Sequence, residues 1–386
     1  MDVEDKKNQH IENSFTEIDN MGDLNNILNY VKSLFYSHVK DSKPIQVKSL
    51  WYYSNPNWNY KSYTQFPIRK KDGSERIITA PVSELKLIQR CLNFVFNVLY
   101  EPHPGATGFL PNSNVVENAK IHIGKNYVYN VDIKDFFPSI SFYRIKNVLQ
   151  LEPFYLKEEI AFRVANICCY GGVLPQGAPT SPTLTNVVCQ KLDRRLEGLS
   201  KRFGANYTRY VDDITFSSSH NLYQEGSKFI LEMKRIIHDQ KFRLNDRKTR
   251  LQKRGYRQEV TGLTVNEKPN LSRRYMRQVR AMLSNWEKRG LSNATAKFRK
   301  NYISDKGHVK SHNNEFVDVL SGKLEYMGMV RGKKDPLYQK YKEQFFRLVE
   351  GKSNGIIVND NLKSILLTWE KEGIGDAMNK YYLQYG

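Results

Sequence analysis

The chain has 386 residues, which is enough to bury a sizeable core and to form two or three domains. Its 40% hydrophobic and 26% charged residues are typical of a globular protein, and it has no run of the ~18 apolar residues that a membrane span needs. The net charge of +20 favours a polyanionic partner, because Lys and Arg displace the counterions that condense on phosphates. The polar, acidic start does not resemble a secretory signal peptide, so we expect a cytoplasmic protein with no membrane partner.

The cysteines lack the spacing of a metal site. They show no CxxC pair and no clustered histidines, and adjacent cysteines such as Cys168 and Cys169 seldom bridge to each other. The sequence therefore predicts free, buried thiols in a reducing compartment rather than a zinc site. The cysteines are Cys91, Cys168, Cys169 and Cys189.

The N-terminal part of the sequence predicts an extension followed by a β-hairpin. Residues 1–45 are polar, with one amphipathic helix expected between Leu24 and Val39. Over about 63–80, apolar residues flank a Lys-Asp-Gly turn, which is the pattern of a β-hairpin with a basic tip. A helix over 85–100 and a loop rich in Pro and Gly follow.

The central part of the sequence mixes strands and helices, and the C-terminal part is helical. A strand over 127–133 precedes a helical region that ends near Cys169, and a continuous apolar face predicts a helix over 184–199. The elements expected after that are two strands around an Asp-Asp turn over 206–217, a helix over 228–239, a short hairpin over 259–268 and a helical remainder over about 270–386.

Three aspartates give the first chemical signal. Asp212 and Asp213 lie between strand-like flanks, where aspartate is a poor strand residue but suits a tight turn. Asp132 ends an apolar strand earlier in the chain. Carboxylates gathered in this way are the oxygen ligands that two Mg²⁺ ions need for phosphoryl transfer, and without a cation they would repel one another. Taken singly, the acids fit an ordinary acidic turn and a helix N-cap equally well.

The segment GGVLPQGAPTSP gives the next signal. Prolines and glycines bracket Gln176 and Gly177 ahead of a long helix, and Thr180, Ser181 and Pro182 are typical of a helix start. Such a rigid turn suits a backbone that lies flat against a base pair or a sugar. A simple capped loop is the alternative interpretation.

In this order, the motifs resemble those of the reverse transcriptases over residues 66–266, roughly half of the chain. The resemblance implies an α+β right-hand polymerase, with fingers, a palm of antiparallel sheet plus helices, and a helical thumb. It also implies RNA-directed DNA polymerase activity, with two Mg²⁺ ions bound by Asp132, Asp212 and Asp213. The expected domains are an N-terminal extension over 1–45, fingers and palm over 46–258, and a thumb and C-terminal RNA-binding region over 259–386.

The resemblance also implies roles in nucleotide binding. Phe137 matches the aromatic steric gate that favours dNTPs over rNTPs, and Gln176 and Gly177 match residues that line the nascent base pair. Lys70 and Arg76, on the basic hairpin, match positions that hold the incoming triphosphate through charge-assisted contacts. A merely solvated basic hairpin is the alternative.

Lys248, in the segment NDRKT, completes the expected catalytic residues. It resembles the lysine that protonates the departing pyrophosphate as a general acid. Plain steering of phosphates is the alternative role.

Two further strings resemble signatures of bacterial retron reverse transcriptases. They are NAKIH, from Asn118 to His122, and Val260-Thr261-Gly262 on the hairpin after the palm. We expect Asn118 and His122 to bind RNA, although His122 by itself fits a packing histidine as well. Val211 departs from the retron pattern, in which many members have alanine at this place in the turn.

The retron resemblance implies a specific job. The enzyme would copy part of its own structured non-coding RNA into multicopy single-stranded DNA, primed from an RNA 2′-hydroxyl. Its expected partners are this RNA, the DNA product, dNTPs and an effector (toxin) protein in an anti-phage defence system. An oligomer that contains the RNA–DNA and the effector is compatible with this job.

Arginines after the palm predict an RNA-binding surface. Three of them fall at helical i, i+4, i+7 spacing, so that one helix face would be positive. Structured RNA is bound chiefly through backbone and shape contacts, which suit arginine. A solvated basic face is the alternative. The expected RNA-binding residues of this region are Arg254, Arg273, Arg274, Arg277 and Arg280.

Other functions fit less of the sequence. The nearest is another bacterial defence (abortive-infection type) or group II intron-like reverse transcriptase, which often lacks the pairing of NAKIH with Val-Thr-Gly. A non-catalytic RNA-binding scaffold would be favoured by loss of one acid, and all three are present. A metal-dependent nuclease would not explain the basic hairpin, the Pro-Gln-Gly turn or Phe137.

Overall fold

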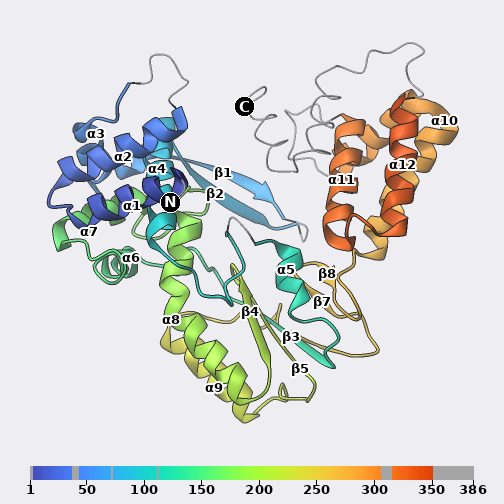
Figure 1. The fold of residues 1–386 in the computed structure, drawn as a ribbon. Helices are drawn as coiled ribbons and strands as arrows, with labels where there is room; N and C mark the ends of the chain where they lie inside the picture. Colours follow the sequence, from blue (N-terminus) through green and yellow to red (C-terminus); the bar gives the residue numbers. More distant parts are fainter. Residues whose placement is uncertain (1–2, 37–42, 71–72, 111–112, 306–314, 351–386) are drawn as a thin grey trace. The chain divides into compact units, whose positions relative to one another are not determined.

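The computed structural model describes residues 3–36, 43–70, 73–110, 113–305 and 315–350 (Figure 1). The chain forms two compact units, residues 1–269 and 270–386. Helices and antiparallel sheets are both present, so the predicted α+β class is confirmed. Among the described residues, no helix is both long and apolar enough to cross a membrane.

The division between the units follows the packing of a small hairpin. Strands β7 (Glu259–Val260) and β8 (Leu263–Thr264) pair with each other, and β8 contacts helix α5 (Val115–Lys120). The hairpin therefore belongs to the first unit, and the division falls after residue 269 instead of at the expected 258. The assignment of these parts to fingers, palm and thumb stays a prediction.

The N-terminal helices are part of the first unit's core. Helix α2 covers most of the predicted amphipathic stretch, and Leu24, Leu28 and Val31 on its inner face are fully buried. Helices α1 and α2 both contact α4, so residues expected to form an extension contribute to the main core. The bounds of the first helices are α1 (Val3–Thr16), α2 (Met21–Tyr36), α3 (Val47–Tyr53), the short 3₁₀ helix η1 (Asn59–Ser62) and α4 (Ser83–Leu99).

The predicted basic hairpin is a separate two-stranded sheet. Strands β1 (Tyr63–Arg69) and β2 (Glu75–Pro81) pair antiparallel, with Ile68 opposite Arg76. The side chains around the tip are exposed, as expected for basic residues that face solvent or a ligand.

A four-stranded antiparallel sheet forms the centre of the first unit. Its strand order is β4-β5-β3-β6, so that β3 lies between β5 and β6. Helix α8 contacts β4 and α9, and Figure 1 shows these two helices along one side of the sheet. The bounds are β3 (Tyr127–Asp132), α6 (Phe142–Leu149), α7 (Glu158–Cys168), α8 (Ser181–Arg202), β4 (Asn206–Tyr210), β5 (Asp213–Ser218), α9 (Lys228–Asp239) and β6 (Arg250–Lys253).

Helix α9 shows how local sequence produces these elements. The side chain of Ser227 caps the first turn by accepting from the backbone N–H of Ile230. Apolar residues then recur at helical spacing, and Phe229, Met233 and Ile237 are buried on one face. The observed bounds match the predicted helix over 228–239.

All four cysteines are buried thiols that form no disulfide bond, as predicted. Burial raises the pKa of the Cys91 thiol to about 11 and that of Cys168 and Cys189 to about 12. These thiols are therefore protonated at neutral pH and act as small apolar core residues.

In the part of the second unit that the structure describes, three helices pack together. They are α10 (Arg273–Asp305), α11 (Phe316–Arg331) and α12 (Pro336–Glu350). Trp286 of α10 lies edge-on to Phe316 and Phe345, which joins the three helices through one aromatic cluster. Gly290 has a φ of 74°, which breaks the regular helix inside α10. The predicted helical character of this region is confirmed for the described residues.

Replacing Leu28 with alanine should destabilise the first unit by about 2–5 kcal/mol, because the removed side chain leaves a cavity in a fully buried site. Urea unfolding followed by circular dichroism would measure this loss. Asn26→Ala, at an exposed position of the same helix, is the matched control and should cost much less. Equal losses in the two variants would show that α2 is not part of the core.

His122 is a buried residue whose polar atoms are both satisfied. Its Nδ1 lies 2.7 Å from the Ser217 hydroxyl and its Nε2 lies 2.8 Å from the Thr208 hydroxyl. Burial, reinforced by the charge of Lys125, lowers the pKa of His122 to about 3. The ring is therefore neutral in the folded protein at every pH near neutrality.

This buried histidine should make stability depend on pH. An unfolded histidine takes up a proton below about pH 6.5, whereas folded His122 does not, so the unfolded state binds more protons as the pH falls. We expect His122 to remove about 2 kcal/mol of stability between pH 7 and pH 5. Urea unfolding at both pH values should show a smaller pH-dependent loss for His122→Gln than for the wild type. Parallel losses in the two proteins would contradict a neutral, buried His122.

Candidate active site

The strand register brings the predicted aspartates to one end of the central sheet. Asp132 is the last residue of β3 and Asp213 is the first residue of β5, and the two are direct antiparallel partners. Asp212 precedes Asp213 in the turn between β4 and β5, and its carbonyl accepts from the backbone N–H of Ile133 at 3.0 Å. Residues far apart in the sequence therefore meet because β3 pairs with β5.

The turn itself has an unusual backbone. Val211 has a φ of 63°, a left-handed conformation that is rare for a β-branched residue. This conformation lets the chain reverse between β4 and β5 with Asp212 and Asp213 at the tip. The side chain of Val211 is buried, so it anchors the turn to the core.

Burial and the neighbouring carboxylates raise the pKa values of Asp212 and Asp213. Desolvation and the charge of Asp132 raise the pKa of Asp212. Although Asp213 is exposed as a residue, desolvation of its carboxyl and the charges of Asp212 and Asp132 raise its pKa to about 6. The cluster is thus unfavourable for negative charge and would be relieved by a cation.

Lys248 and Asn245 contact the third carboxylate. Lys248 Nζ donates to Asp132 Oδ2 at 2.9 Å and Asn245 Nδ2 donates to Asp132 Oδ1 at 3.0 Å. The hydrogen bond with Asp132 raises the pKa of Lys248, so the lysine stays protonated at neutral pH. Lys248 was expected at this site from the sequence, whereas Asn245 was not. Its position three residues before that lysine could have indicated it.

The donor atoms at this site suit Mg²⁺, which prefers carboxylate oxygens. As the side chains stand, no set of three His, Cys, Asp or Glu residues in the described ranges is close enough together to hold a metal ion. Both oxygens of Asp132 are engaged by Asn245 and Lys248 instead. The Lys248 side chain is 60% exposed, so it can leave Asp132 without disturbing packing and free that carboxylate for a cation.

Part of the expected nucleotide site lies beside these acids. The positive charge of Arg76 is near enough to Asp212 to oppose the rise in its pKa. Lys70 is exposed at the end of the same hairpin, where its backbone N–H donates to the carbonyl of Ser74 at 2.7 Å. The hairpin therefore carries Arg76 near Asp212 and Lys70 at its exposed end.

The Pro-Gln-Gly turn packs against the hairpin. The backbone N–H of Thr79 donates to the carbonyl of Gln176 at 2.8 Å. Gly177 has a φ of 130°, and a Cβ at this position would lie 2.8 Å from Ile78 and 2.9 Å from the carbonyl oxygen of Thr79. Only glycine fits this close approach, which fixes the turn against β2.

Phe137 lies just beyond β3 and is half-buried. Its ring is 5.6 Å from that of Phe136 and 6.4 Å from that of Phe109. These aromatic neighbours restrict the ring, and its role as a steric gate stays a prediction.

Two of the expected RNA-binding residues are buried inside the first unit. Asn118 is 1% exposed and His122 is fully buried, so neither side chain is available to contact RNA in this structure and their predicted role is not supported. Asn118 instead accepts from the hydroxyl of Thr107 at 2.9 Å. Asn118 and His122 of the NAKIH string are therefore buried packing residues, and His122 contacts strands of the sheet.

The expected RNA-binding arginines are divided between the two units. Arg254 is exposed after β6 in the first unit, whereas the other four lie exposed at the start of α10 in the second unit. The helical spacing predicted for Arg273, Arg277 and Arg280 is confirmed, and the guanidinium of Arg280 donates to the Tyr341 hydroxyl at 3.1 Å. The four of the second unit are Arg273, Arg274, Arg277 and Arg280.

Sequence reasoning also missed a buried ion pair beneath the turn. Arg209 of β4 and Asp193 of α8 are both fully buried and contact each other at 2.7 Å. The local sequence of neither element predicts this pair, because Arg and Asp also occur commonly on exposed faces of strands and helices.

The family model and the relatives that this chain matches are all reverse transcriptases. Residues 68–286 match the family model described as reverse transcriptase (RNA-dependent DNA polymerase). The retron Mx162 reverse transcriptase of Myxococcus xanthus is 36% identical over 258 residues, which cover 58% of this chain and 53% of the relative. The retron Ec86 reverse transcriptase of Escherichia coli is 37% identical over 166 residues, which cover 42% of this chain and 50% of the relative. The chain thus spans about half the length of these relatives.

A solved telomerase from Candida albicans, in complex with a fragment of telomeric RNA, aligns with a TM-score of 0.42 and 11% identity over 76% of this chain and 64% of that chain. The match with the family model covers more than half of the 386 residues. The chain therefore belongs to the reverse transcriptase (RNA-dependent DNA polymerase) family.

Proposed function

We propose that this protein is a retron-type RNA-directed DNA polymerase. It copies part of a cognate structured non-coding RNA into multicopy single-stranded DNA. The observation that carries the proposal is the meeting of Asp132, Asp212 and Asp213 at one end of the sheet, beside Lys248 and Arg76. The similarity to retron enzymes of two bacterial species supports the retron type.

The three aspartates would hold two Mg²⁺ ions. When bound, these ions lower the pKa of the attacking 3′-hydroxyl and stabilise charge on the leaving pyrophosphate. The chain's own contribution is a set of oxygen ligands whose mutual repulsion favours occupation by a cation.

The remaining residues act on the nucleotide. Arg76 and Lys70 bind the triphosphate through charge-assisted contacts, and Gln176 and Gly177 line the nascent base pair. Lys248 is protonated at neutral pH, so it is suited to give a proton to the departing pyrophosphate as its contact with Asp132 is released. Phe137 excludes a ribose 2′-hydroxyl.

The proposal extends to the biological role. Priming from an RNA 2′-hydroxyl gives a branched RNA–DNA product, which stays with the enzyme and an effector protein in an anti-phage defence system. Arginines of both units, among them Arg254 and Arg277, bind the structured RNA. A reverse transcriptase of another defence system or of the group II intron type is the second candidate, and it would give unbranched DNA.

Asp212→Asn should abolish DNA synthesis, because the change removes one of the proposed metal ligands. The protein should still fold and bind RNA, because asparagine has nearly the size and shape of aspartate. The protein is expressed with its native flanking DNA, and the nucleic acid that copurifies is treated with RNase and debranching enzyme. Wild-type protein should carry short single-stranded DNA joined to RNA through a 2′,5′ branch, and the variant should carry RNA alone.

Asp246→Asn is the matched control, since it makes the same chemical change at an exposed acid outside the cluster. It should yield branched DNA at the wild-type level. Synthesis by Asp212→Asn at the wild-type rate would refute the site. Unbranched DNA from the wild type would support the polymerase activity but contradict the retron type. It would favour the second candidate, a reverse transcriptase of another defence system or of the group II intron type.

Phe137→Ala should increase the incorporation of rNTPs relative to dNTPs, because a smaller side chain leaves room for the 2′-hydroxyl. Steady-state kcat/KM for dGTP and GTP on an RNA template with a DNA primer measures this ratio. Tyr143→Ala removes an aromatic side chain that is 73% exposed and should leave the ratio unchanged. An unchanged ratio in Phe137→Ala would remove the steric gate from the mechanism.

A further inference from the structure

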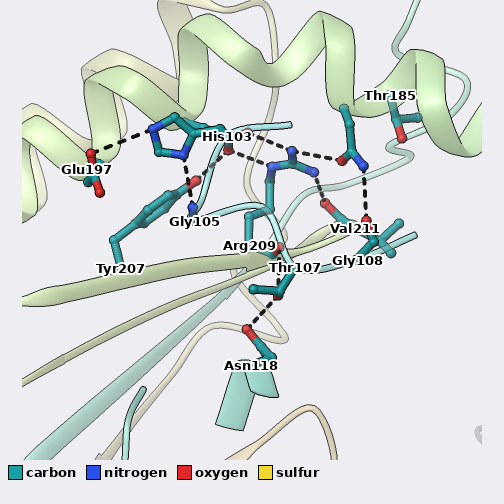
Figure 2. A network of polar contacts seen from close by, with 12 residues as sticks. His103, Gly105, Thr107, Gly108, Asn118, Thr185, Glu197, Tyr207, Arg209 and Val211 are labelled. Atoms are coloured by element: carbon teal, nitrogen blue, oxygen red, sulfur yellow. Dashed lines mark hydrogen bonds and ion pairs between the residues drawn. The ribbon is translucent and has the colours of Figure 1, made fainter. Parts of the chain in front are cut away.

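Arg209 connects the core of the first unit to the Asp-Asp turn. It lies in β4, and its side chain is fully buried against α8 (Figure 2). Its Nε and Nη2 donate to the two carboxylate oxygens of Asp193, each at 2.7 Å. This two-pronged contact fixes the plane of the guanidinium, because both groups are rigid and planar.

The same guanidinium has two more acceptors. Its Nη1 donates to the carbonyl oxygen of Val211 at 3.1 Å, and its Nη2 donates to Asn186 Oδ1 at 3.1 Å. The Val211 carbonyl belongs to the peptide group that leads directly into Asp212. Arg209 is thus a direct link from two buried residues of α8 to the backbone of the turn.

The loop that precedes α5 also contacts the turn, through Gly105 and Gly108. The backbone N–H of Arg209 donates to the carbonyl of Gly105 at 2.7 Å, and Asn186 Nδ2 donates to the carbonyl of Gly108 at 3.0 Å. A Cβ on Gly108 would lie 2.7 Å from the backbone nitrogen of Val211. The turn is therefore held by Arg209 and bounded by Gly108.

The contacts of Arg209 and Gly108 act on Val211, which is the most strained residue of the turn. Val211 is held at a φ of 63°, which a β-branched residue adopts only when its surroundings impose it. Buried ion pairs contribute little net stability compared with well-packed apolar residues, so stability alone does not account for a charged pair in this place. The hydrogen bond to the Val211 carbonyl gives the pair a specific task.

We propose that Arg209 is a positioning residue, which fixes the left-handed turn at Val211 and so directs Asp212 and Asp213 toward Asp132. This inference rests on the proposed polymerase function of the same carboxylates. Arg209 contacts none of the reacting atoms and acts only through the backbone of the turn. Asp193 and Asn186 serve the turn by holding the guanidinium.

Arg209→Lys tests this role in the full-length protein. Lysine keeps a positive charge for Asp193, but its single ammonium cannot reproduce a planar fork with four acceptor contacts. We expect kcat for dNTP incorporation on an RNA template with a DNA primer to fall by roughly 10- to 100-fold, with little change in KM for dNTP. Binding of Mn²⁺ to the protein alone, followed by electron paramagnetic resonance of free Mn²⁺, should weaken by roughly 10-fold.

Tyr207→Phe is the matched control. The Tyr207 hydroxyl donates to Asp193 Oδ1 at 2.6 Å, so this variant also removes a buried hydrogen bond from the same carboxylate. It leaves the contact between Arg209 and the Val211 carbonyl in place. The variant should unfold at a lower temperature than the wild type, with unchanged kcat per folded molecule and unchanged Mn²⁺ binding.

Gly108→Ala disturbs the turn without touching the ion pair, and it decides the question if Arg209→Lys does not fold. Its added methyl group should displace Val211 and reproduce the loss of kcat and of Mn²⁺ affinity. If the two variants behave like Tyr207→Phe, Arg209 only stabilises the fold and the proposal is overturned.

A failure of the proposed function has a different signature. If the wild type and Asp212→Asn incorporate dNTPs equally, the polymerase site is wrong. Mn²⁺ affinity then still decides the positioning role, because weaker binding by Arg209→Lys and Gly108→Ala supports it and unchanged binding refutes it.

Discussion

The antiparallel pairing of β3 with β5 is the interaction on which the rest of this unit depends. It places Asp132 opposite Asp213, with Asp212 beside them, and so brings three negative charges to one end of a sheet. The raised pKa values of Asp212 and Asp213 express the cost of this arrangement. The groups around the acids offset part of that cost. Lys248 contacts Asp132, and the charge of Arg76 opposes the rise in the pKa of Asp212.

Two buried polar side chains that contact the sheet, Arg209 and His122, have all of their nitrogens paired. Arg209 has Asp193, Asn186 and the Val211 carbonyl, and His122 has the hydroxyls of Ser217 and Thr208. A buried network of this kind specifies one arrangement of the strands, because any shift leaves a charged or polar atom without a partner. The sheet is thereby a rigid support for a turn that is itself strained.

The two elements that we propose to bind the nucleotide contact each other through their backbones. Gly177 lies against Ile78 and Thr79 of the basic hairpin, and the carbonyl of Gln176 accepts from Thr79. The Pro-Gln-Gly turn is therefore packed directly against the hairpin that carries Arg76. This contact gives a physical reason for glycine in a motif that the sequence showed only as a pattern.

The sequence by itself determined the local elements and the identity of the acids. Helical spacing located α9, the Lys-Asp-Gly turn located the β1–β2 hairpin, and strand-like flanks located Asp212 and Asp213, because these signals arise between neighbours in the chain. Only the tertiary structure decided which distant residues meet. In the folded chain His122 is buried, and Asn245 and Lys248 donate to Asp132. Arg209 pairs with Asp193, and the arginines expected to bind RNA are divided between two units. Those outcomes depend on strand register and on helices packing against the sheet, which no local pattern of residues specifies.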